Sequence, residues 1–207
     1  MDFGKLFKSV EDAVYEVMVW ILLLPKTLFR SMFAPKWAMK YVGEEWEKKP
    51  DDRFDDYLSP VLLWLLVAVI PFSIAIIFSG DLRSMDDFNK ALSSDLLRTT
   101  LYMMVIPFTY IAWMEVVNKR PVKKSTLKRS FYMHCFALAP AQLLTVVFIL
   151  LALFMSPLWI IAVLILPIYE GFVFQTELET GYMKAFFYAL VPQVVLLVVG
   201  LILVLSL

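Results

Sequence analysis

The chain has little of what most catalytic and metal-binding sites are built from. It contains one histidine and one cysteine in 207 residues, and only 18% of its residues are charged. The single cysteine, Cys135, excludes an intrachain disulfide. The adjacent pair His134 and Cys135 is too small for a zinc site, which takes about four ligands. The sequence also has no phosphate-binding loop, dinucleotide-binding glycine pattern, HExxH motif or GxSxG motif. We therefore expect no enzyme activity, no cofactor and no metal.

The chain also has no net charge, since 19 basic residues balance 19 acidic ones. Nothing attracts the whole molecule to a polyanion, and we expect no recognition of duplex nucleic acid. What the sequence has in excess is apolar residues, which make up 61% of it, whereas about half is usual for a soluble domain. Long uncharged runs hold most of them, and such runs are typical of membrane-spanning helices.

These runs predict five membrane crossings, because about 20 apolar residues suffice for each one. The uncharged run 130–169 would form a helix of about 60 Å, twice a hydrocarbon core of about 30 Å, so it must fold back. We place the turn at Ser156-Pro157, because proline cannot continue the preceding helix. The predicted crossings are residues 58–79, 99–118, 131–155, 158–175 and 185–207.

Residues 1–56 precede the crossings and are too charged to span a membrane. Within 3–18, apolar residues recur at helical spacing and charged residues occupy the opposite face. This pattern predicts an amphipathic helix in the membrane interface, or alternatively a cytoplasmic helix packed on the membrane domain. The predicted fold class is all-α. Residues 57–207 are expected to form a polytopic bundle of five transmembrane helices, preceded by the amphipathic interfacial region 1–56.

The distribution of lysine and arginine predicts the orientation. If five crossings alternate, one side of the membrane receives sixteen basic residues and the other receives three. Basic residues stay on the cytoplasmic side. We therefore expect a multi-pass protein of the bacterial inner membrane with a cytoplasmic N-terminus, a cytoplasmic 118–130 loop and an outside C-terminus.

Each predicted crossing has one interior proline, and these are Pro71, Pro107, Pro140, Pro167 and Pro192. A proline leaves the carbonyl four residues earlier without its helical partner. Those carbonyls belong to Val67, Met103, Phe136, Val163 and Tyr188. One interpretation is a set of kinked helices around a cavity lined by these carbonyls and by Gln142 and Gln193. The alternative is that the prolines only produce packing kinks.

Three ionisable residues lie in or near the predicted crossings. Glu170 follows Pro167 by three residues, so both share a helix face. A charge in hydrocarbon is costly and normally faces a partner or water. Glu170 is therefore a candidate to gate a pathway, attract cations or carry a proton, with His134 considered as its partner; structural pairing is the alternative. His134 is also explicable as a hydrogen-bonded histidine near the interface, and Glu115 as a carboxylate that snorkels with Lys119.

The 118–130 segment carries six basic residues and no acid: Lys119, Arg120, Lys123, Lys124, Lys128 and Arg129. Such a cluster beside a membrane usually binds anionic lipid and sets topology. The alternative is a docking site for a cytoplasmic partner or a nucleotide-type anion. The acidic stretch 44–56 lacks the spacing of a calcium loop. We interpret it as a solvated segment or as the partner of the basic loop in another subunit.

Three short stretches carry a family resemblance: Phe33-Ala34-Pro35, Tyr57-Leu58-Ser59-Pro60, and Ser-Phe-Tyr-Met-His-Cys-Phe-Ala-Leu-Ala-Pro at 130–140. With the five-crossing plan, they resemble the Yip-domain superfamily and its bacterial permease-like inner-membrane relatives. The resemblance implies a five-helix fold and provides no catalytic residues.

The sequence supports three functional hypotheses. The first is a homo-oligomeric channel or pore, because five mostly apolar helices offer too few polar groups for a hydrophilic pathway within one protomer. Such a pore could be a ligand- or partner-gated membrane effector of a bacterial anti-phage system. The second is a Yip-like membrane scaffold that recruits partners. The third is a small transporter, ranked last because two large inverted halves are missing.

Overall fold

The computed structural model describes residues 3–78, 96–119, 123–152, 155 and 157–205, and every regular element in these ranges is helical. The all-α fold class is therefore confirmed. The elements are α1 (Phe3–Phe33), α2 (Pro35–Glu47), the short 3₁₀ helix η1 (Pro50–Asp52), α3 (Pro60–Phe78), α5 (Leu96–Asn118), α6 (Lys124–Ala152), α7 (Leu158–Leu178) and α8 (Tyr182–Leu205).

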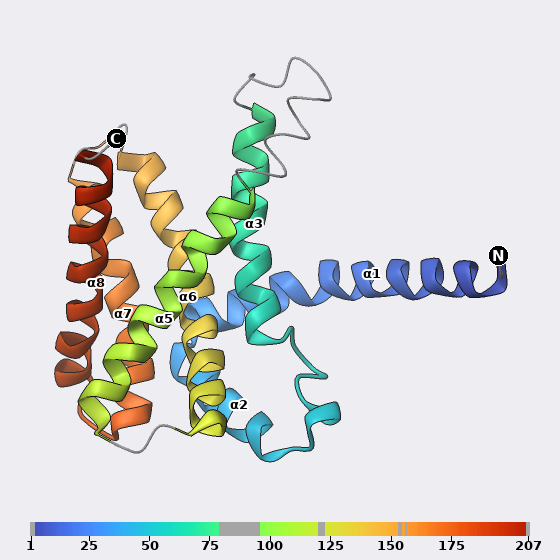
Figure 1. Ribbon diagram of the computed structural model, residues 1–207, viewed down its shortest axis with the longest axis horizontal. Coiled ribbons are helices and arrows are strands. Elements are labelled where there is room, and N and C mark those ends of the chain that lie inside the picture. Colours follow the sequence, from blue (N-terminus) through green and yellow to red (C-terminus); the bar gives the residue numbers. More distant parts are fainter. Residues whose placement is uncertain (1–2, 79–95, 120–122, 153–154, 156, 206–207) are drawn as a thin grey trace.

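Helix α6 is the centre of the bundle. It packs against α1, α2, α3, α5 and α7, and α7 in turn packs against α8. Figure 1 shows that successive bundle helices run in opposite directions, with α5 inclined across α6. All residues of α6 from Met133 to Ala141 are buried. Three of them are alanines (Ala137, Ala139 and Ala141), whose small side chains allow neighbouring helices to approach closely.

Three helices, α6, α7 and α8, are long and apolar enough over their described residues to cross a membrane. The membrane character predicted from composition is thus supported. Helices α3 and α5 coincide with the other two predicted crossings. In α3, the side chains that the structure describes end at Val69, and those from Pro60 to Val69 form an apolar stretch. Five crossings therefore remain a prediction.

Proline determines two of the chain breaks. The turn predicted at Ser156-Pro157 agrees with the helix bounds, since α6 ends at Ala152 and α7 begins directly after Pro157, while Ser156 lies outside the described residues. A second break lies at Ala34, where the chain bends by 118° between α1 and α2. Pro35 disfavours the helical conformation of the residue before it, and Ala34 accordingly leaves the helix with φ −134° and ψ 63°. Pro35 itself starts α2, a position where its missing N–H costs nothing.

Two helices begin before the crossings predicted within them. Helix α6 begins at Lys124, so Lys124, Lys128 and Arg129 lie on a helix and not in a 118–130 loop. Lysine, leucine and arginine are good helix formers. Because the crossings were predicted from uncharged apolar runs, the charged first turn of this helix was not included. Helix α8 begins at Tyr182, three residues before the predicted crossing. In both cases the helix extends beyond the apolar run.

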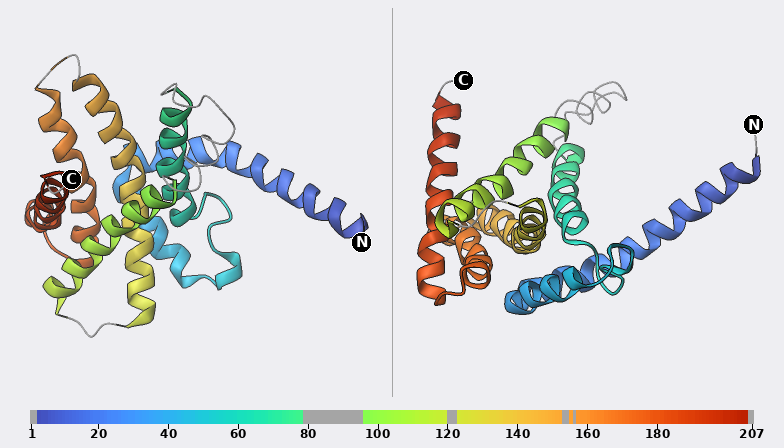
Figure 2. Two further views of the ribbon diagram at one scale, coloured as in Figure 1. Left: turned by 45° about the horizontal axis from the view of Figure 1, so that its top comes forward. Right: turned by 60° about the horizontal axis from the view of Figure 1, so that its bottom comes forward.

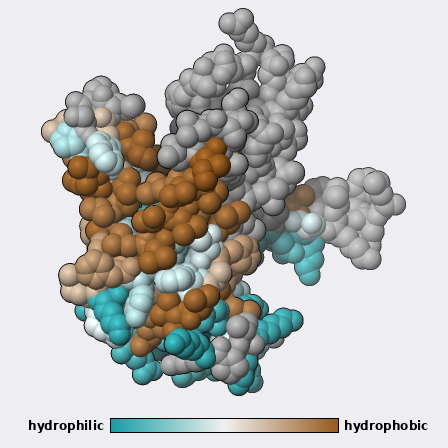
Figure 3. Space-filling view, turned by 60° about the vertical axis from the view of Figure 1, so that its left-hand side comes forward, coloured by the Kyte–Doolittle hydropathy of each residue, from teal (hydrophilic) through white to brown (hydrophobic). Residues whose placement is uncertain are grey.

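The helix ends separate into two groups. The C-terminal ends of α5 and α7 and the N-terminal ends of α6 and α8 lie at one end of the bundle, together with η1 (Figure 1). The C-terminal end of α8 lies at the other end with the α6–α7 turn. Figure 3 shows a largely hydrophobic face above a hydrophilic lower end. Of the segments predicted to be cytoplasmic, η1 and the N-terminal ends of α6 and α8 thus share one end of the molecule, whereas α1 extends sideways from the bundle (Figure 1). The side of the membrane that this end faces remains a prediction.

The N-terminal region has two differently placed parts. Its later part packs on the bundle: the Tyr169 hydroxyl donates to the Met32 carbonyl at 2.7 Å, and the Leu58 N–H donates to Thr27 Oγ1 at 3.1 Å. Its first part, the N-terminal half of α1, extends away from the bundle (Figures 1 and 2). Whether residues 1–56 lie in the membrane interface or in the cytoplasm stays a prediction.

Candidate functional site

A buried contact between two ionisable side chains joins the two central helices. His134 of α6 and Glu170 of α7 place Nδ1 and Oε2 2.5 Å apart, and both side chains are completely buried. The partner that the sequence suggested for Glu170 is thus confirmed. Moving a charged group from water into the protein interior costs several kcal/mol. Only a close partner with good hydrogen-bond geometry offsets a cost of that size. Such a pair is therefore a functional-site candidate when it lies inside an apolar bundle.

Aromatic side chains enclose the pair. The Tyr110 ring of α5 lies 6.0 Å from the His134 ring, and the Phe174 ring of α7 lies 6.1 Å from it, measured between centroids. The Tyr110 hydroxyl donates to Gln193 Oε1 of α8 at 3.2 Å. Four helices therefore meet at one place, where three of the predicted cavity residues, His134, Glu170 and Gln193, gather around Tyr110.

Tyr110 was missed by the sequence analysis. It is completely buried and stands among apolar residues in the run Thr-Tyr-Ile-Ala-Trp of α5. The available signal was chemical: a buried tyrosine hydroxyl usually finds a hydrogen-bond partner. That signal identifies a polar contact but not the helix on which the partner lies.

The pair keeps two polar atoms without a partner among the described residues, His134 Nε2 and Glu170 Oε1. Ser130 Oγ, one helical turn before His134, is also buried and unpartnered there. A neutral imidazole has one donor and one acceptor nitrogen, and a carboxylate has two acceptor oxygens. When His134 Nδ1–H donates to Glu170, Nε2 is the acceptor that can take a further proton. The arrangement can therefore hold or exchange a proton without breaking the bond between the two side chains.

The prolines are packed inside the protomer. Pro107, Pro140, Pro167 and Pro192 are buried, and each lies within its helix. Pro71 lies within α3, and its side chain is outside the described residues. Gln142 is half-buried on α6, two turns beyond His134. A cavity lined by all of these residues remains a prediction.

One proline-freed carbonyl has a specific partner. The Tyr188 carbonyl, four residues before Pro192, accepts a hydrogen bond from Trp113 Nε1 at 3.0 Å. This carbonyl was expected to line a cavity, but it is used to join α5 to α8. Proline-freed groups in membrane helices are commonly satisfied by neighbouring helices in this way.

The basic residues do not form one free patch. Arg129 Nη2 lies 4.0 Å from Glu177 Oε1 of α7, while the side chains of Lys123, Lys124 and Lys128 are exposed. Arg120 lies outside the described residues. The part of the cluster that is available to lipid or to a soluble anion is therefore the exposed lysines.

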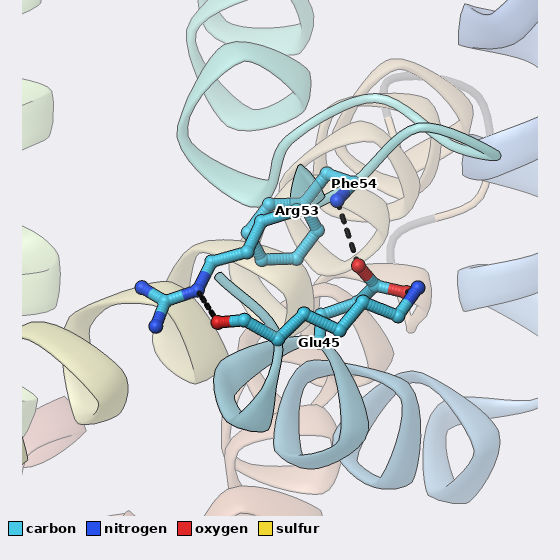
Figure 4. Close-up of polar contacts among 4 residues, drawn as sticks. Glu45, Arg53 and Phe54 are labelled. Carbon is cyan, nitrogen blue, oxygen red and sulfur yellow. Dashed lines mark hydrogen bonds and ion pairs between the residues drawn. The ribbon is translucent and has the colours of Figure 1, made fainter. Parts of the chain in front are cut away.

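The acidic stretch 44–56 is not wholly solvated, because Glu45 is buried. Glu45 Oε1 accepts from Lys48 Nζ at 2.6 Å, and Oε2 accepts from the Phe54 N–H at 2.7 Å (Figure 4). Arg53 Nε donates to the Lys48 carbonyl at 3.1 Å. These bonds fix the segment after α2, where Phe54 has the left-handed φ of 65°. Burial opposes ionisation of Glu45, but the hydrogen bonds from Lys48 and Phe54 hold its pKa below the ordinary value.

The chain matches none of the known proteins with which it was compared. No family model matches it, and no curated protein or solved structure is significantly similar to it. The resemblance to Yip-domain and permease-like proteins therefore stays a prediction. Among the described residues, no group of three or more histidine, cysteine, aspartate or glutamate side chains is placed to hold a metal ion.

Proposed function

We propose that the protein is a homo-oligomeric membrane channel or pore in which the His134–Glu170 pair controls conduction. The observation that carries the proposal is the 2.5 Å contact between two completely buried ionisable side chains at the junction of α5, α6, α7 and α8. In this proposal α3 and α5 cross the membrane together with α6, α7 and α8.

The energetics favour a functional origin of the pair. Replacing a buried ion pair with packed apolar residues is often neutral or stabilising. A protein that only anchors itself in a membrane gains nothing from keeping both groups. A protein that changes conformation on protonation needs them, because adding or removing a proton alters the charge of a site that cannot be solvated.

The surface favours a pathway shared between copies. Exposed apolar side chains cover outward positions of α7 and α8, among them Trp159, Ile160, Val194 and Val198. Such a face suits lipid or another protomer. The polar groups of one protomer are drawn inward to the pair and to Gln193, so several protomers would be needed to line a water-filled path. Gating by a soluble partner or ligand at the end that holds Lys123, Lys124 and Lys128 would make the pore an effector of the anti-phage type.

Ion flux through proteoliposomes tests the proposal. Purified full-length protein is reconstituted into vesicles loaded with an ion-sensitive dye, and flux is followed with and without candidate nucleotide ligands. We expect flux that scales with the protein-to-lipid ratio. The Glu44→Gln variant, which removes an exposed carboxylate of α2, serves as the matched control and should conduct like the wild type. Vesicles as tight as empty ones under all conditions would contradict the proposal.

A membrane scaffold is the second candidate, favoured by the N-terminal region. The guanidinium of Arg30 packs over the Trp37 ring at 4.2 Å and contacts the Tyr57 hydroxyl. The bend between α1 and α2 is thus held against the bundle, while the first half of α1 extends outward (Figure 1). A scaffold would retain its partners after Glu170→Gln, whereas the pore would change its conduction.

A further inference from the structure

An apolar groove runs along the outer surface between α5 and α8. It encloses about 240 Å³ and is lined by Thr109, Ala112, Trp113, Val116, Val191, Pro192 and Val195. Figure 3 views the molecule from the side on which α8 lies, and most of this side is hydrophobic. The groove therefore opens where a membrane-spanning bundle meets lipid.

The groove has a fixed floor. Pro192 is buried, and the Trp113 indole is held by its 3.0 Å bond to the Tyr188 carbonyl. Ala112 contributes only a methyl group, so α5 leaves space at its centre. In contrast, Val116 is 64% exposed and Val195 is 47% exposed. The space is thus preformed and is accessible from the side.

Two lysines extend the groove toward the hydrophilic end of the bundle. Lys184 precedes Val191 by seven residues on α8, and Lys119 comes directly after Asn118, the last residue of α5. A spacing of seven residues keeps Lys184 on the helix face of Val191, while Lys119 lies at the end of α5 where the chain leaves the helix with φ 52°. Lys184 Nζ also lies 5.8 Å from the centroid of the Tyr188 ring, on the face that leads to the groove. Both lysines are exposed, and neither has an ion pair within the ranges that the structure describes.

We infer that this groove binds a phospholipid with an anionic headgroup. One acyl chain lies in the groove, and the phosphate contacts Lys184 and Lys119. An apolar cavity of roughly 150 Å³ already accommodates benzene, so the groove is large enough for a segment of hydrocarbon chain. Basic side chains at the edge of a membrane domain attract anionic headgroups. The inference needs the bundle to lie in a membrane, but it does not depend on conduction by the His134–Glu170 pair.

Native mass spectrometry of the full-length protein in detergent tests the inference. The probes are phosphatidylglycerol and phosphatidylcholine with identical acyl chains. We expect the wild type to retain phosphatidylglycerol preferentially, and each of Lys184→Gln and Lys119→Gln to weaken that binding about fivefold. The control Lys36→Gln removes an exposed lysine of α2, a helix that contributes no residue to the groove, and should bind like the wild type.

A second variant separates the acyl chain from the headgroup. Val195→Trp fills the groove from an exposed position, where folding tolerates a larger side chain. It should weaken the binding of both lipids. Equal retention of the two lipids by the wild type would overturn the headgroup assignment. Unchanged lipid binding by Val195→Trp would overturn the groove as a lipid site. So would a wild-type dimer that is insensitive to lipid but dissociates in Val195→Trp, because the groove would then be an interface between two copies of the chain.

Discussion

His134 Nδ1 and Glu170 Oε2 lie 2.5 Å apart with both side chains completely buried between α6 and α7. The two residues are 36 positions apart in the sequence, and each comes from a helix that is apolar enough to cross a membrane. The contact is therefore a fully buried polar link between the central helices, and the stability of the bundle should depend on keeping both partners or on removing both.

Single and double substitutions of the pair test this dependence. His134→Ala and Glu170→Ala should each lower the free energy of unfolding by about 3–5 kcal/mol, because each leaves an uncompensated buried group. The double variant His134→Leu/Glu170→Met should recover most of that loss, since a packed apolar pair has no group to compensate. Thermal unfolding in detergent measures the effect. Single variants as stable as the wild type would show that the pair is solvated.

Loss of the Trp113 indole N–H should separate α5 from α8. Trp113→Phe keeps an aromatic ring but leaves the Tyr188 carbonyl without its 3.0 Å donor. Because Pro192 cannot supply the helical N–H, we expect a loss of about 1 kcal/mol in the free energy of unfolding. Trp159→Phe, at a side chain that is 58% exposed, is the control and should be neutral. Equal stability of both variants would mean that another donor satisfies the carbonyl.

Glu45 should make the segment after α2 sensitive to acid. Its folded-state pKa is lowered from 4.5, so its stabilisation is fully present above pH 4.5 and is lost as the pH falls through the folded-state pKa. At pH 6, Glu45→Gln should lower the free energy of unfolding by about 1–2 kcal/mol, because the bond from the Phe54 N–H loses its charge.

The same variant supplies the pH control. On acidification from pH 6 to pH 3.5, the melting temperature should fall further for the wild type than for Glu45→Gln, since the variant has no carboxylate to protonate. Parallel curves would contradict a role for the ionised carboxylate. Lys48→Gln should have a small effect, because that lysine side chain is 45% exposed.

The projecting half of α1 should lie in the membrane interface. Val10, Val14, Met18 and Ile21 share one face and are 55–66% exposed. Spin labels on single cysteines, in a chain with Cys135 replaced by alanine, measure the depth of each position. At positions 14 and 21 they should be accessible to oxygen dissolved in lipid, and at positions 12 and 16 to a water-soluble relaxation agent. Equal access to the water-soluble agent at all four positions would place α1 in the cytoplasm.

Sequence reasoning predicted the features that depend on local chemistry. Uncharged runs located the helices, and Ser156-Pro157 located the turn between α6 and α7, because proline acts on its own backbone. The cost of a buried charge was sufficient to nominate Glu170 and to name His134 as its partner. These arguments need no knowledge of how helices are arranged.

The features that were missed depend on neighbouring helices. Nothing in the run around Tyr110 indicates that Gln193 will accept its hydroxyl, and nothing near Pro192 indicates that Trp113 will satisfy the Tyr188 carbonyl. Similarly, Glu45 looks like one of several solvated acids until the chain returns and places the Phe54 N–H against it. Each contact depends on tertiary packing, which helical periodicity does not specify.

Single-channel recording of wild type and Glu170→Gln in planar bilayers is the most direct test of the claim that the buried pair controls conduction. The variant keeps the size of the side chain and a hydrogen-bonding group toward His134 but removes the carboxylate. The account predicts discrete openings of the wild type, and an open probability that changes at least tenfold in Glu170→Gln while Glu44→Gln behaves like the wild type. Identical conduction by all three proteins, or silence of the wild type with every candidate ligand, would contradict it.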